Sequence, residues 1–327
     1  MRFVYDNFRN KPFKPLYNAL VPKSYRKKWH YNYSEIPTQM HVAEFWQDAI
    51  TKYQNGEIAH YNLTIHKPEL VGKKIIWQYW AQGMDNLPEL AKICFNSVDY
   101  FKGDYTVIRL SDKDIADYLD FPEFIAGKRL NGEFRPVFFS DLLRVALINN
   151  YGGIWLDASV LMTAPLPEHL IRLPFFVYSR EDHSENKDWG LVADHLYFNW
   201  DVNFKIKFLS SIVFGKPKTA LSQTLQNLLI YYWQTQNSIE HYFFFQILIN
   251  ELKRINAVAF DFPVVDDTYP HLLQFDLNKP FDKVQYDYIT QKSALHKLSF
   301  HKKPRDSNNQ NRQTFYHYIK HQFLNDC

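Results

Sequence analysis

Two aspartates and an arginine, Asp141, Arg144 and Asp157, are the residues whose types and spacing best suggest chemistry. They lie in the stretch SDLLRVALINNYGGIWLDAS, which ends at Ser159. Carboxylate and hydroxyl oxygens suit Mg²⁺ or Mn²⁺, and such an ion can bridge phosphate oxygens. An aspartate–arginine pair can bind hydroxyl groups and stabilise a leaving group. The group therefore predicts a site for a metal ion and a phosphorylated ligand.

Each of these residues also has a structural explanation that needs no ligand. Ser140 is expected to cap a helix, Asp141 to interact with that helix's N-terminal dipole, and Arg144 to pair with Asp141. Asp157 could cap the turn after its strand. It is the combination of these residues on a helix and a strand, joined by two glycines, that favours a shared site.

The expected secondary structure would bring these residues together. A helix from near Ser140 leads through Gly152 and Gly153 into the apolar strand GIWLD, which ends at Asp157. Upstream, the pattern predicts a strand over 73–80, a helix over 87–101, a strand over 104–110 and a short helix opened by Ser111 and Asp114 as a capping box. This alternation predicts an α/β fold with a doubly wound, mostly parallel sheet, in which ligands bind at the carboxyl ends of the strands.

The flanking regions are expected to elaborate this core. Residues 1–72 are predicted to form an N-terminal arm and helices, and residues 73–327 the sheet domain, with halves over 73–165 and 166–327. Outside the core we expect a helix over 41–56, a strand over 174–180, a polar loop over 180–190 and helices over 219–236 and 238–255.

The motifs of this region resemble those of DXD-motif glycosyltransferases of GT-A fold, specifically the capsular polysaccharide synthesis protein group. The family block S-D-x-x-R … Y-G-G-x-Y-L-D-x-D is present here as Ser140, Asp141, Arg144, Tyr151, Gly152, Gly153, Trp155, Leu156, Asp157, Ala158 and Ser159. The family's first strand, I-H-x-x-W-x-G-G, corresponds to IIWQYWAQG, with Trp80 and Gly83 at matching positions. The similarity is strong over roughly 73–165 and weaker elsewhere.

The resemblance implies a donor site for a nucleotide-sugar. Asp141 and Arg144 would hold the donor sugar, and Asp157 would bind Mn²⁺ or Mg²⁺ on the diphosphate. Ser159 stands where the family has a second acid, so a metal there would depend heavily on the phosphates of the donor for its ligands. No residue is marked as a nucleophile, and the catalytic residue stays unassigned.

Further donor contacts are implied at both ends of the domain. Trp80 would stack on the nucleotide base, and Gln78 lies on the same strand. The C-terminal segment LHKLSFHKK would close over the diphosphate, with His296 and Lys297 facing the phosphates. A surface cluster of basic residues is the alternative explanation of that segment.

The resemblance also implies the reaction. The expected activity is transfer of a sugar, with retention of configuration and UDP-hexose favoured as donor, to a glycan acceptor in bacterial capsular or surface polysaccharide synthesis. Two alternatives stay open: a degenerate, non-catalytic domain that binds nucleotide-sugar or scaffolds other transferases, and a glycoside hydrolase. A hydrolase needs a carboxyl group with a raised pKa, whereas Arg144 is expected to lower the pKa of Asp141.

The first 30 residues have a distinct composition. They contain eight Lys or Arg and one acid, Asp6, interleaved with aromatic and aliphatic residues. Such a segment is typical of one that lies on an anionic membrane surface, although an arm packed on its own domain has the same composition. Nucleic acid is not an expected partner, because no basic stripe continues into the rest of the chain.

The remaining composition predicts a protein of the cytoplasm, peripheral at the inner face of the cell membrane. There are two cysteines, Cys94 and Cys327, which indicates neither a disulfide framework nor a zinc cluster. No apolar run approaches the ~18 residues of a membrane span. The N-terminus lacks the pattern of a signal peptide.

Overall fold

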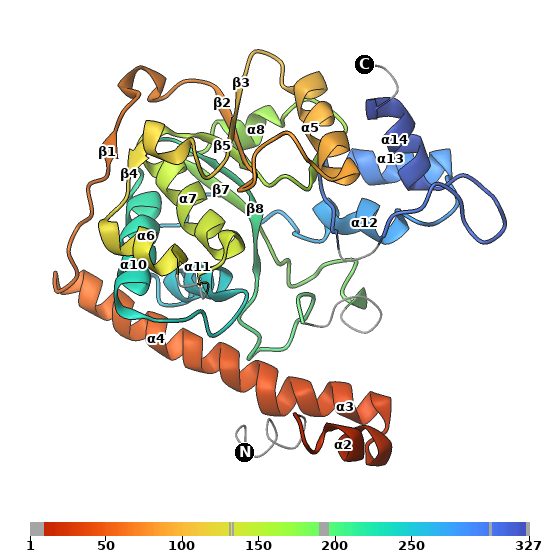
Figure 1. Ribbon diagram of the computed structural model, residues 1–327, viewed down its shortest axis with the longest axis horizontal. Coiled ribbons are helices and arrows are strands. Elements are labelled where there is room, and N and C mark those ends of the chain that lie inside the picture. Colours follow the sequence, from red (N-terminus) through yellow and green to blue (C-terminus); the bar gives the residue numbers. More distant parts are fainter. Residues whose placement is uncertain (1–9, 131, 133, 190–195, 301–302, 325–327) are drawn as a thin grey trace. The chain divides into compact units, whose positions relative to one another are not determined.

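The computed structural model describes residues 10–130, 132, 134–189, 196–300 and 303–324. The chain divides into two compact units, whose helices and strands are labelled in Figure 1. The helical unit comprises Met1–Ala59, Asp182–Lys207 and Ser238–Ala257, and the sheet unit comprises His60–Glu181, Phe208–Asn237 and Val258–Cys327. The boundary predicted after residue 72 stays a prediction.

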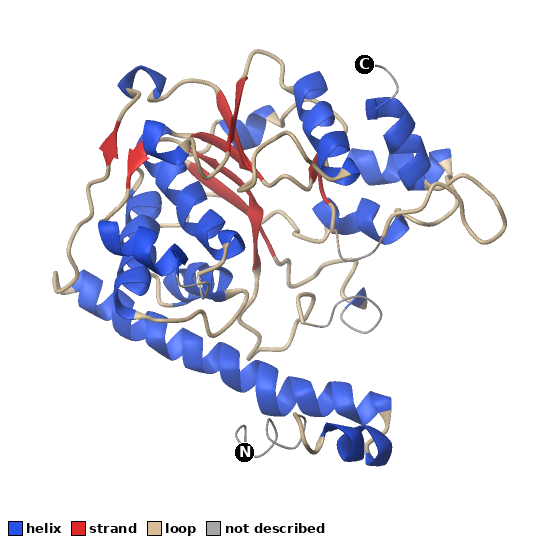
Figure 2. Ribbon diagram, viewed as in Figure 1, coloured by secondary structure: helices blue, strands red, loops and turns tan. Residues whose placement is uncertain are grey.

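The sheet unit is built on five strands in the order β3-β2-β5-β8-β7 (Figure 2). Its strands are β2 (Ile75–Tyr79), β3 (Thr106–Leu110), β5 (Gly153–Leu156), β7 (Phe175–Ser179) and β8 (Phe208–Gly215). Strand β2 is parallel to β3 and β5, as predicted, whereas β8 is antiparallel to both β5 and β7. The α/β prediction is confirmed, but the sheet is mixed. The end of β7 (Ser179) lies beside the start of β8 (Phe208), and the two strands are neighbours in the sheet. Strand β8 therefore runs in the opposite direction to β7.

Two small sheets and a set of helices complete this unit. The small sheets pair β1 (Thr64–Ile65) with β4 (Leu119–Asp120), and β6 (Val160–Met162) with β9 (Leu295–Lys297), both antiparallel. The helices are α5 (Glu89–Phe101), α6 (Glu123–Leu130), α7 (Pro136–Tyr151), α8 (Glu168–Ile171), α10 (Ala220–Thr235), α12 (Leu272–Asp276), α13 (Lys283–Lys292) and α14 (Phe315–Leu324), with single 3-10 turns at Pro68–Leu70, Ile115–Asp117 and Tyr269–His271.

Helix α7 lies at the centre of the sheet unit. It packs on β2, β5 and β8, and α10 packs against α7. Every residue from Phe138 to Tyr151 is buried, as expected of a helix that is covered on all sides. The predicted start near Ser140 is wrong, because the helix begins at Pro136, whose missing N–H is not needed in the first turn. Ser140 therefore caps nothing, and Asp141 lies beyond the first turn instead of at the helix dipole.

Gly152 and Gly153 make the tight return from α7 to β5. Both have positive φ, 77° and 101°, which L side chains rarely adopt. A Cβ on Gly153 would lie 2.6 Å from the Ile75 carbonyl oxygen of the neighbouring strand, and one on Gly152 would lie 2.7 Å from Pro217. The sheet can approach this turn only because neither residue has a side chain.

Gly153→Ala is expected to lower the free energy of unfolding by more than about 3 kcal/mol, because the alanine combines an unfavourable φ with a backbone clash. Urea unfolding measures the change. The matched control is Gly127→Ala on the exposed side of α6, where a Cβ meets no atom within 4 Å. There alanine should stabilise the helix by about 1 kcal/mol. Equal effects of the two substitutions would contradict this explanation of the glycine pair.

Most of the other predicted elements of the sheet unit are present. The strands expected over 73–80, 104–110 and 174–180 are β2, β3 and β7, and the helix over 219–236 is α10. The capping contact at Ser111 forms, since its backbone N–H donates to Asp114 at 2.7 Å. A single 3-10 turn follows it, however, and not the expected helix, because the chain turns directly into β4.

The helical unit contains α2 (Lys14–Leu20), α3 (Lys23–His30), a π-helical turn (Tyr31–Glu35), α4 (Ile36–Gln54) and α11 (Phe244–Arg254). Helices α4 and α11 pack together, and the buried Trp46 indole donates to the Phe244 carbonyl at 2.9 Å. The helix predicted over 41–56 thus starts earlier, at Ile36, while the one predicted over 238–255 starts later, at Phe244. In the part of the chain that the structure describes, no helix is both long and apolar enough to span a membrane.

Candidate functional site

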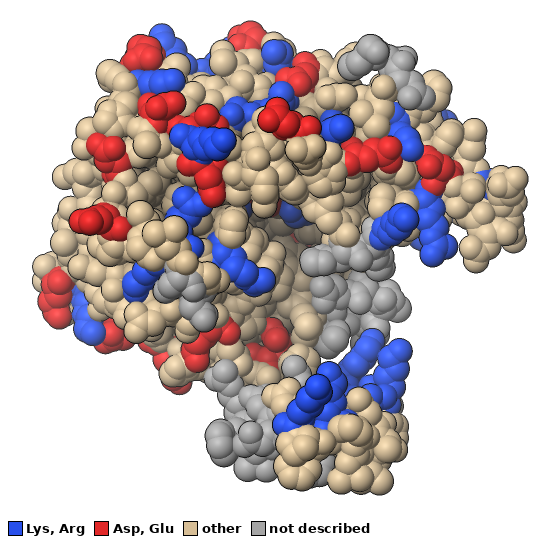
Figure 3. Space-filling view, viewed as in Figure 1, with Lys and Arg blue, Asp and Glu red and all other residues tan. Residues whose placement is uncertain are grey.

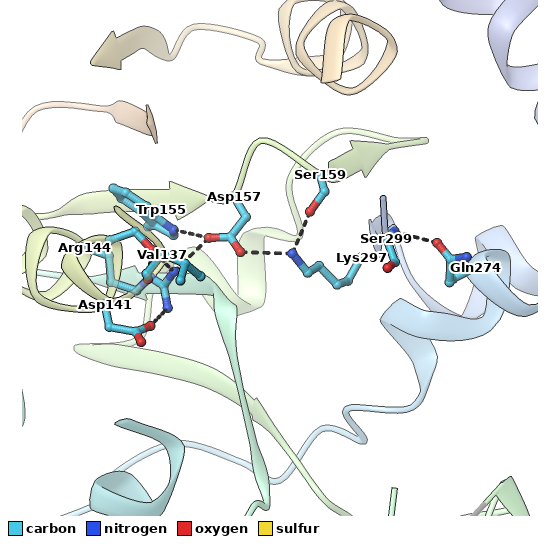
Figure 4. Close-up of polar contacts among 10 residues, drawn as sticks. Val137, Asp141, Arg144, Trp155, Asp157, Ser159, Gln274, Lys297 and Ser299 are labelled. Carbon is cyan, nitrogen blue, oxygen red and sulfur yellow. Dashed lines mark hydrogen bonds and ion pairs between the residues drawn. The ribbon is translucent and has the colours of Figure 1, made fainter. Parts of the chain in front are cut away.

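The turn after β5 presents the first two site residues. Asp157 follows the last residue of β5, at the carboxyl end of the strand as predicted, and its N–H donates to the Ser211 carbonyl on β8 at 3.0 Å. The Val160 N–H donates back to the Asp157 carbonyl at 2.8 Å, which closes a turn over residues 157–160. The Asp157 and Ser159 side chains then point toward the same neighbour, Lys297 (Figure 4).

Arg144 on α7 joins the two aspartates. One guanidinium nitrogen donates to Asp141 in a very short contact, and the other donates to Asp157 Oδ1 at 3.0 Å (Figure 4). The Arg144 side chain is 3% exposed and the Asp141 side chain is 8% exposed. The Trp155 indole N–H also donates to Asp157 Oδ1, at 2.7 Å. The predicted trio is therefore one contiguous network, and the carboxylate of Asp157 is at its more exposed end.

The two carboxyl groups titrate differently. Burial raises the pKa of Asp141 to about 7, although Arg144 acts in the opposite direction. Burial would also raise the pKa of Asp157, but Lys297 and Arg144 outweigh it and hold that pKa below its ordinary value. The expectation of a lowered pKa for Asp141 is therefore wrong. Arg144 does act to lower it, but burial outweighs the guanidinium and the neighbouring Asp157 carboxylate adds to the rise.

Lys297 reaches this network from the C-terminal segment. Its position on β9 is opposite Val160 in the antiparallel pairing with β6. Lys297 Nζ lies 3.0 Å from Asp157 Oδ2 and 2.6 Å from Ser159 Oγ. The resemblance implied that Lys297 faces the phosphates, and that role stays a prediction. The structure adds its direct contacts with Asp157 and Ser159.

His296 has a different environment from its neighbour Lys297. Successive side chains of a strand point to opposite faces, and His296 is fully buried, with Nε2 2.9 Å from the Thr163 hydroxyl. Burial lowers the pKa of His296 to about 3, so the ring is neutral at pH 7. The predicted role of His296 at the phosphates stays a prediction. Its contact with Thr163 lies on the face of β9 opposite to the Lys297 side chain.

Gln78 lies on β2, and Trp80 directly follows that strand, whose carboxyl end is at the same edge of the sheet as that of β5. Trp80 is half-buried, and its ring centroid lies 5.9 Å from that of Phe300, which is 44% exposed. Gln78 is fully buried and accepts a hydrogen bond from Arg109 Nε at 3.0 Å. Trp80 is thus partly exposed to solvent, whereas Gln78 lies beneath the surface.

The polar groups at Asp157 fit a divalent cation poorly. Both carboxylate oxygens already accept N–H groups, from Arg144 and Trp155 on one and from Lys297 on the other. The second predicted ligand, Ser159, contacts the same ammonium. Among the described residues, no cluster of three or more His, Cys, Asp or Glu is arranged to hold a metal ion. A cation between Asp157 and Ser159 would have to displace Lys297.

Two aromatic residues of the site were not singled out by the sequence. Trp155 donates to Asp157, and its ring also lies under the Arg144 guanidinium, 5.3 Å from its centroid. Its position two residues before the acid, on the same face of the strand, was an available signal. Phe300 follows Lys297 by three residues, but no local pattern indicated its contact with Trp80.

Comparison with known proteins identifies the family of this chain. The family model described as capsular polysaccharide synthesis protein matches residues 26–319, most of the chain. The chain belongs to this family. A curated relative, the O-glycosyltransferase braB of Annulohypoxylon truncatum, is 30% identical over 120 residues, which cover 34% of this chain and 28% of the relative. The chain therefore matches little more than a quarter of that protein, whereas the capsular polysaccharide family model covers most of the chain.

Proposed function

We propose that this member of the capsular polysaccharide synthesis family is a glycosyltransferase that moves a sugar from a nucleotide-sugar to a glycan acceptor. The observation that carries the proposal is the network of Asp141, Arg144, Asp157 and Lys297 at the carboxyl end of β5. Membership of the family and the similarity to an O-glycosyltransferase support the same reaction class. We further propose UDP-hexose as donor, a bacterial surface polysaccharide as product and a GT-A type of fold.

The residues have distinct roles in this proposal. Asp141 and Arg144 bind hydroxyl groups of the donor sugar, since the buried pair offers both an acceptor and a planar donor. The Trp80 ring stacks on the base of the nucleotide. The diphosphate lies over Asp157 and Lys297, where positive charge stabilises the leaving nucleotide as the bond to the anomeric carbon breaks. We propose that the sugar is transferred with retention, and no nucleophile is assigned.

A donor screen tests the proposal. The purified protein is incubated with UDP-, GDP- and dTDP-sugars, with and without Mn²⁺ or Mg²⁺, and release of free nucleotide is measured. Release from one class of donor, faster with acceptor glycans, is expected. Nucleotide binding without release in any condition would instead support the non-catalytic alternative, and neither binding nor release would overturn the proposal.

The pKa of Asp141 gives the glycoside hydrolase alternative one favourable feature. The pKa is raised to about 7 for Asp141 and lowered below its ordinary value for Asp157. Two carboxyl groups with pKa values separated in this way are typical of a general acid and an ionised carboxylate in one active site. Both groups, however, contact the same guanidinium, which constrains their movement. Cleavage of a glycan in the complete absence of nucleotide-sugar would favour the hydrolase.

Trp80→Ala is expected to weaken nucleotide binding about tenfold or more, because stacking of a base on an aromatic side chain contributes roughly 1–3 kcal/mol in nucleic-acid complexes. Trp80→Phe should recover part of the loss. Calorimetry with the best nucleotide of the screen gives both values. The control is Trp46→Phe, a buried substitution in the helical unit, which should leave the dissociation constant unchanged. Normal nucleotide binding by folded Trp80→Ala would show that this ring is not a base platform.

The N-terminal helices support a second element of the proposal, contact with an anionic membrane that carries a lipid-linked acceptor. Phe13, just before α2, and Leu16 and Leu20 on α2 recur at helical spacing and are 49%, 51% and 67% exposed. Lysine and arginine side chains gather over α2 and α3 in Figure 3, and residues 10–34 contain no acid. Exposed apolar side chains beside unopposed positive charge fit a surface of anionic lipid headgroups. Residues 1–9 of the predicted 1–30 segment lie outside the described residues.

Replacing Lys23, Lys27 and Lys28 together by Gln is expected to weaken binding to phosphatidylglycerol vesicles about a hundredfold at low salt, because each basic residue contributes about 1 kcal/mol. Sedimentation with vesicles measures the effect, and binding should also weaken as salt screens the charges. Donor turnover in solution should be unaffected.

The matched control removes three lysines from the sheet unit, Lys279, Lys283 and Lys292. Its net charge is the same, so a purely electrostatic attraction of the whole molecule would be weakened equally. Equal losses in the two triple variants, or binding that is independent of salt, would contradict a docking surface at α2 and α3.

A further inference from the structure

We propose that the Lys297 ammonium is the resident cation of the diphosphate site, so that this protein binds its nucleotide diphosphate without a divalent metal ion. The inference rests on the proposed function and replaces the Mn²⁺ or Mg²⁺ that the sequence predicted at Asp157 and Ser159. Its basis is one juxtaposition: the two predicted metal ligands contact the same ammonium, at 3.0 and 2.6 Å (Figure 4).

The backbone fixes Lys297 at this place. On one side, the Leu298 N–H donates to the Ser159 carbonyl at 2.9 Å, and on the other, the Thr163 N–H donates to the Ala294 carbonyl at 3.0 Å. Between them, β9 pairs residue by residue with β6, so Lys297 is opposite Val160, directly after the turn of Asp157 and Ser159. The backbone from which the Lys297 side chain extends is therefore held by hydrogen bonds at both ends of its strand.

The same contacts leave Lys297 able to bind an anion. An ammonium has three N–H donors, and the contacts recorded among the described residues engage two of them, at Asp157 and Ser159. The side chain is 25% exposed, so its remaining donor can face a ligand. Asp157 and Ser159 thereby hold the ammonium at a defined position beside the end of β5.

Electrostatics disfavour adding a metal to this arrangement. Within the part of the chain that the structure describes, Asp157 is the one carboxylate that pairs with Lys297, and its other oxygen already accepts hydrogen bonds from Arg144 and Trp155. A divalent cation would have to replace the ammonium and then remain within a few ångströms of both Lys297 and Arg144. Mg²⁺ and Mn²⁺ prefer several oxygen ligands, whereas the protein offers one acid and one hydroxyl that are both occupied.

The test measures binding rather than turnover. Calorimetry of the full-length protein with UDP, GDP, dTDP and inorganic pyrophosphate is done once in EDTA and once with Mn²⁺. The wild type is expected to bind its nucleotide equally in both, within about threefold. Lys297→Met, which keeps the apolar stem, should bind at least tenfold more weakly in EDTA, or about 1.4 kcal/mol, and should recover with Mn²⁺, because the vacated place can now accept a metal. Lys283→Met, an exposed lysine on α13, is the control with the same change of charge.

The outcomes separate the two proposals. Wild type that binds a nucleotide tightly with Mn²⁺ and at least tenfold more weakly in EDTA overturns this inference and leaves the proposed function standing. Metal-free binding that Lys297→Met does not alter, in a variant whose thermal unfolding shows it to be folded, overturns it as well. Failure of every nucleotide and of pyrophosphate to bind in either buffer overturns the proposed function and this inference with it.

Discussion

Asp157→Ala is expected to lower donor turnover by about a hundredfold or more, which is the order of loss for one preorganised electrostatic group of an active site. The carboxylate holds two cationic side chains, Arg144 and Lys297, toward one place, and its removal leaves each free to reorient. The fold should persist, because Asp157 is 23% exposed at the end of its strand and Arg144 still pairs with Asp141. Turnover of the donor identified in the screen gives the effect, and circular dichroism checks the fold.

Asp157→Asn refines this expectation. The amide oxygen can still accept from Trp155 or Arg144, but the amide nitrogen cannot accept from Lys297. An intermediate loss is therefore expected. Asp287→Ala on α13, whose aspartate pairs with Lys283 at the surface, should change turnover less than twofold. Near-native turnover by Asp157→Ala would show that the network at β5 is structural.

Arg144→Met is expected to give the largest loss of stability, about 3–5 kcal/mol, because it leaves the buried Asp141 without its counter-charge. The loss depends on pH in a defined direction. The pKa of Asp141 is already raised to about 7 in the folded protein, and without Arg144 it rises further. An aspartate whose pKa is higher in the folded than in the unfolded protein destabilises the folded state once the pH exceeds its pKa in the unfolded chain, which is about 4. The destabilisation grows until the pH reaches the pKa in the folded state. Urea unfolding at pH 5 and pH 8 should therefore show the larger loss at pH 8.

A double variant separates stability from function. Arg144→Met with Asp141→Leu removes both buried charges and should recover much of the stability, since replacing a buried pair by apolar residues is often close to neutral. It should recover no turnover, because both proposed sugar contacts are gone. A loss below about 1 kcal/mol in Arg144→Met alone would contradict the role of the pair in the fold.

Local sequence determined the parts of the site that are close together along the chain. Asp141 and Arg144 are three residues apart on a helix and therefore share a face, and an apolar strand after two glycines had to end at Asp157. The positive φ of the glycines and the alternation of strands and helices follow from residue type and periodicity. The start of α7 was misjudged, because Ser140 is a good cap by type but Pro136 begins the helix four residues earlier.

The tertiary structure alone decided what meets Asp157. Lys297 is 140 residues away in sequence, on a strand of three residues that is too short for any periodic pattern. The reversed direction of β8 depends on where the chain re-enters the sheet after the excursion into the helical unit, which no window of sequence records. The raised pKa of Asp141 likewise depends on its burial in the folded protein, which residue type alone does not give. Sequence thus identifies the acids. Only the packing of β9 against β6 brings the Lys297 ammonium within hydrogen-bond distance of Asp157 and Ser159, at the place where a metal ion was expected.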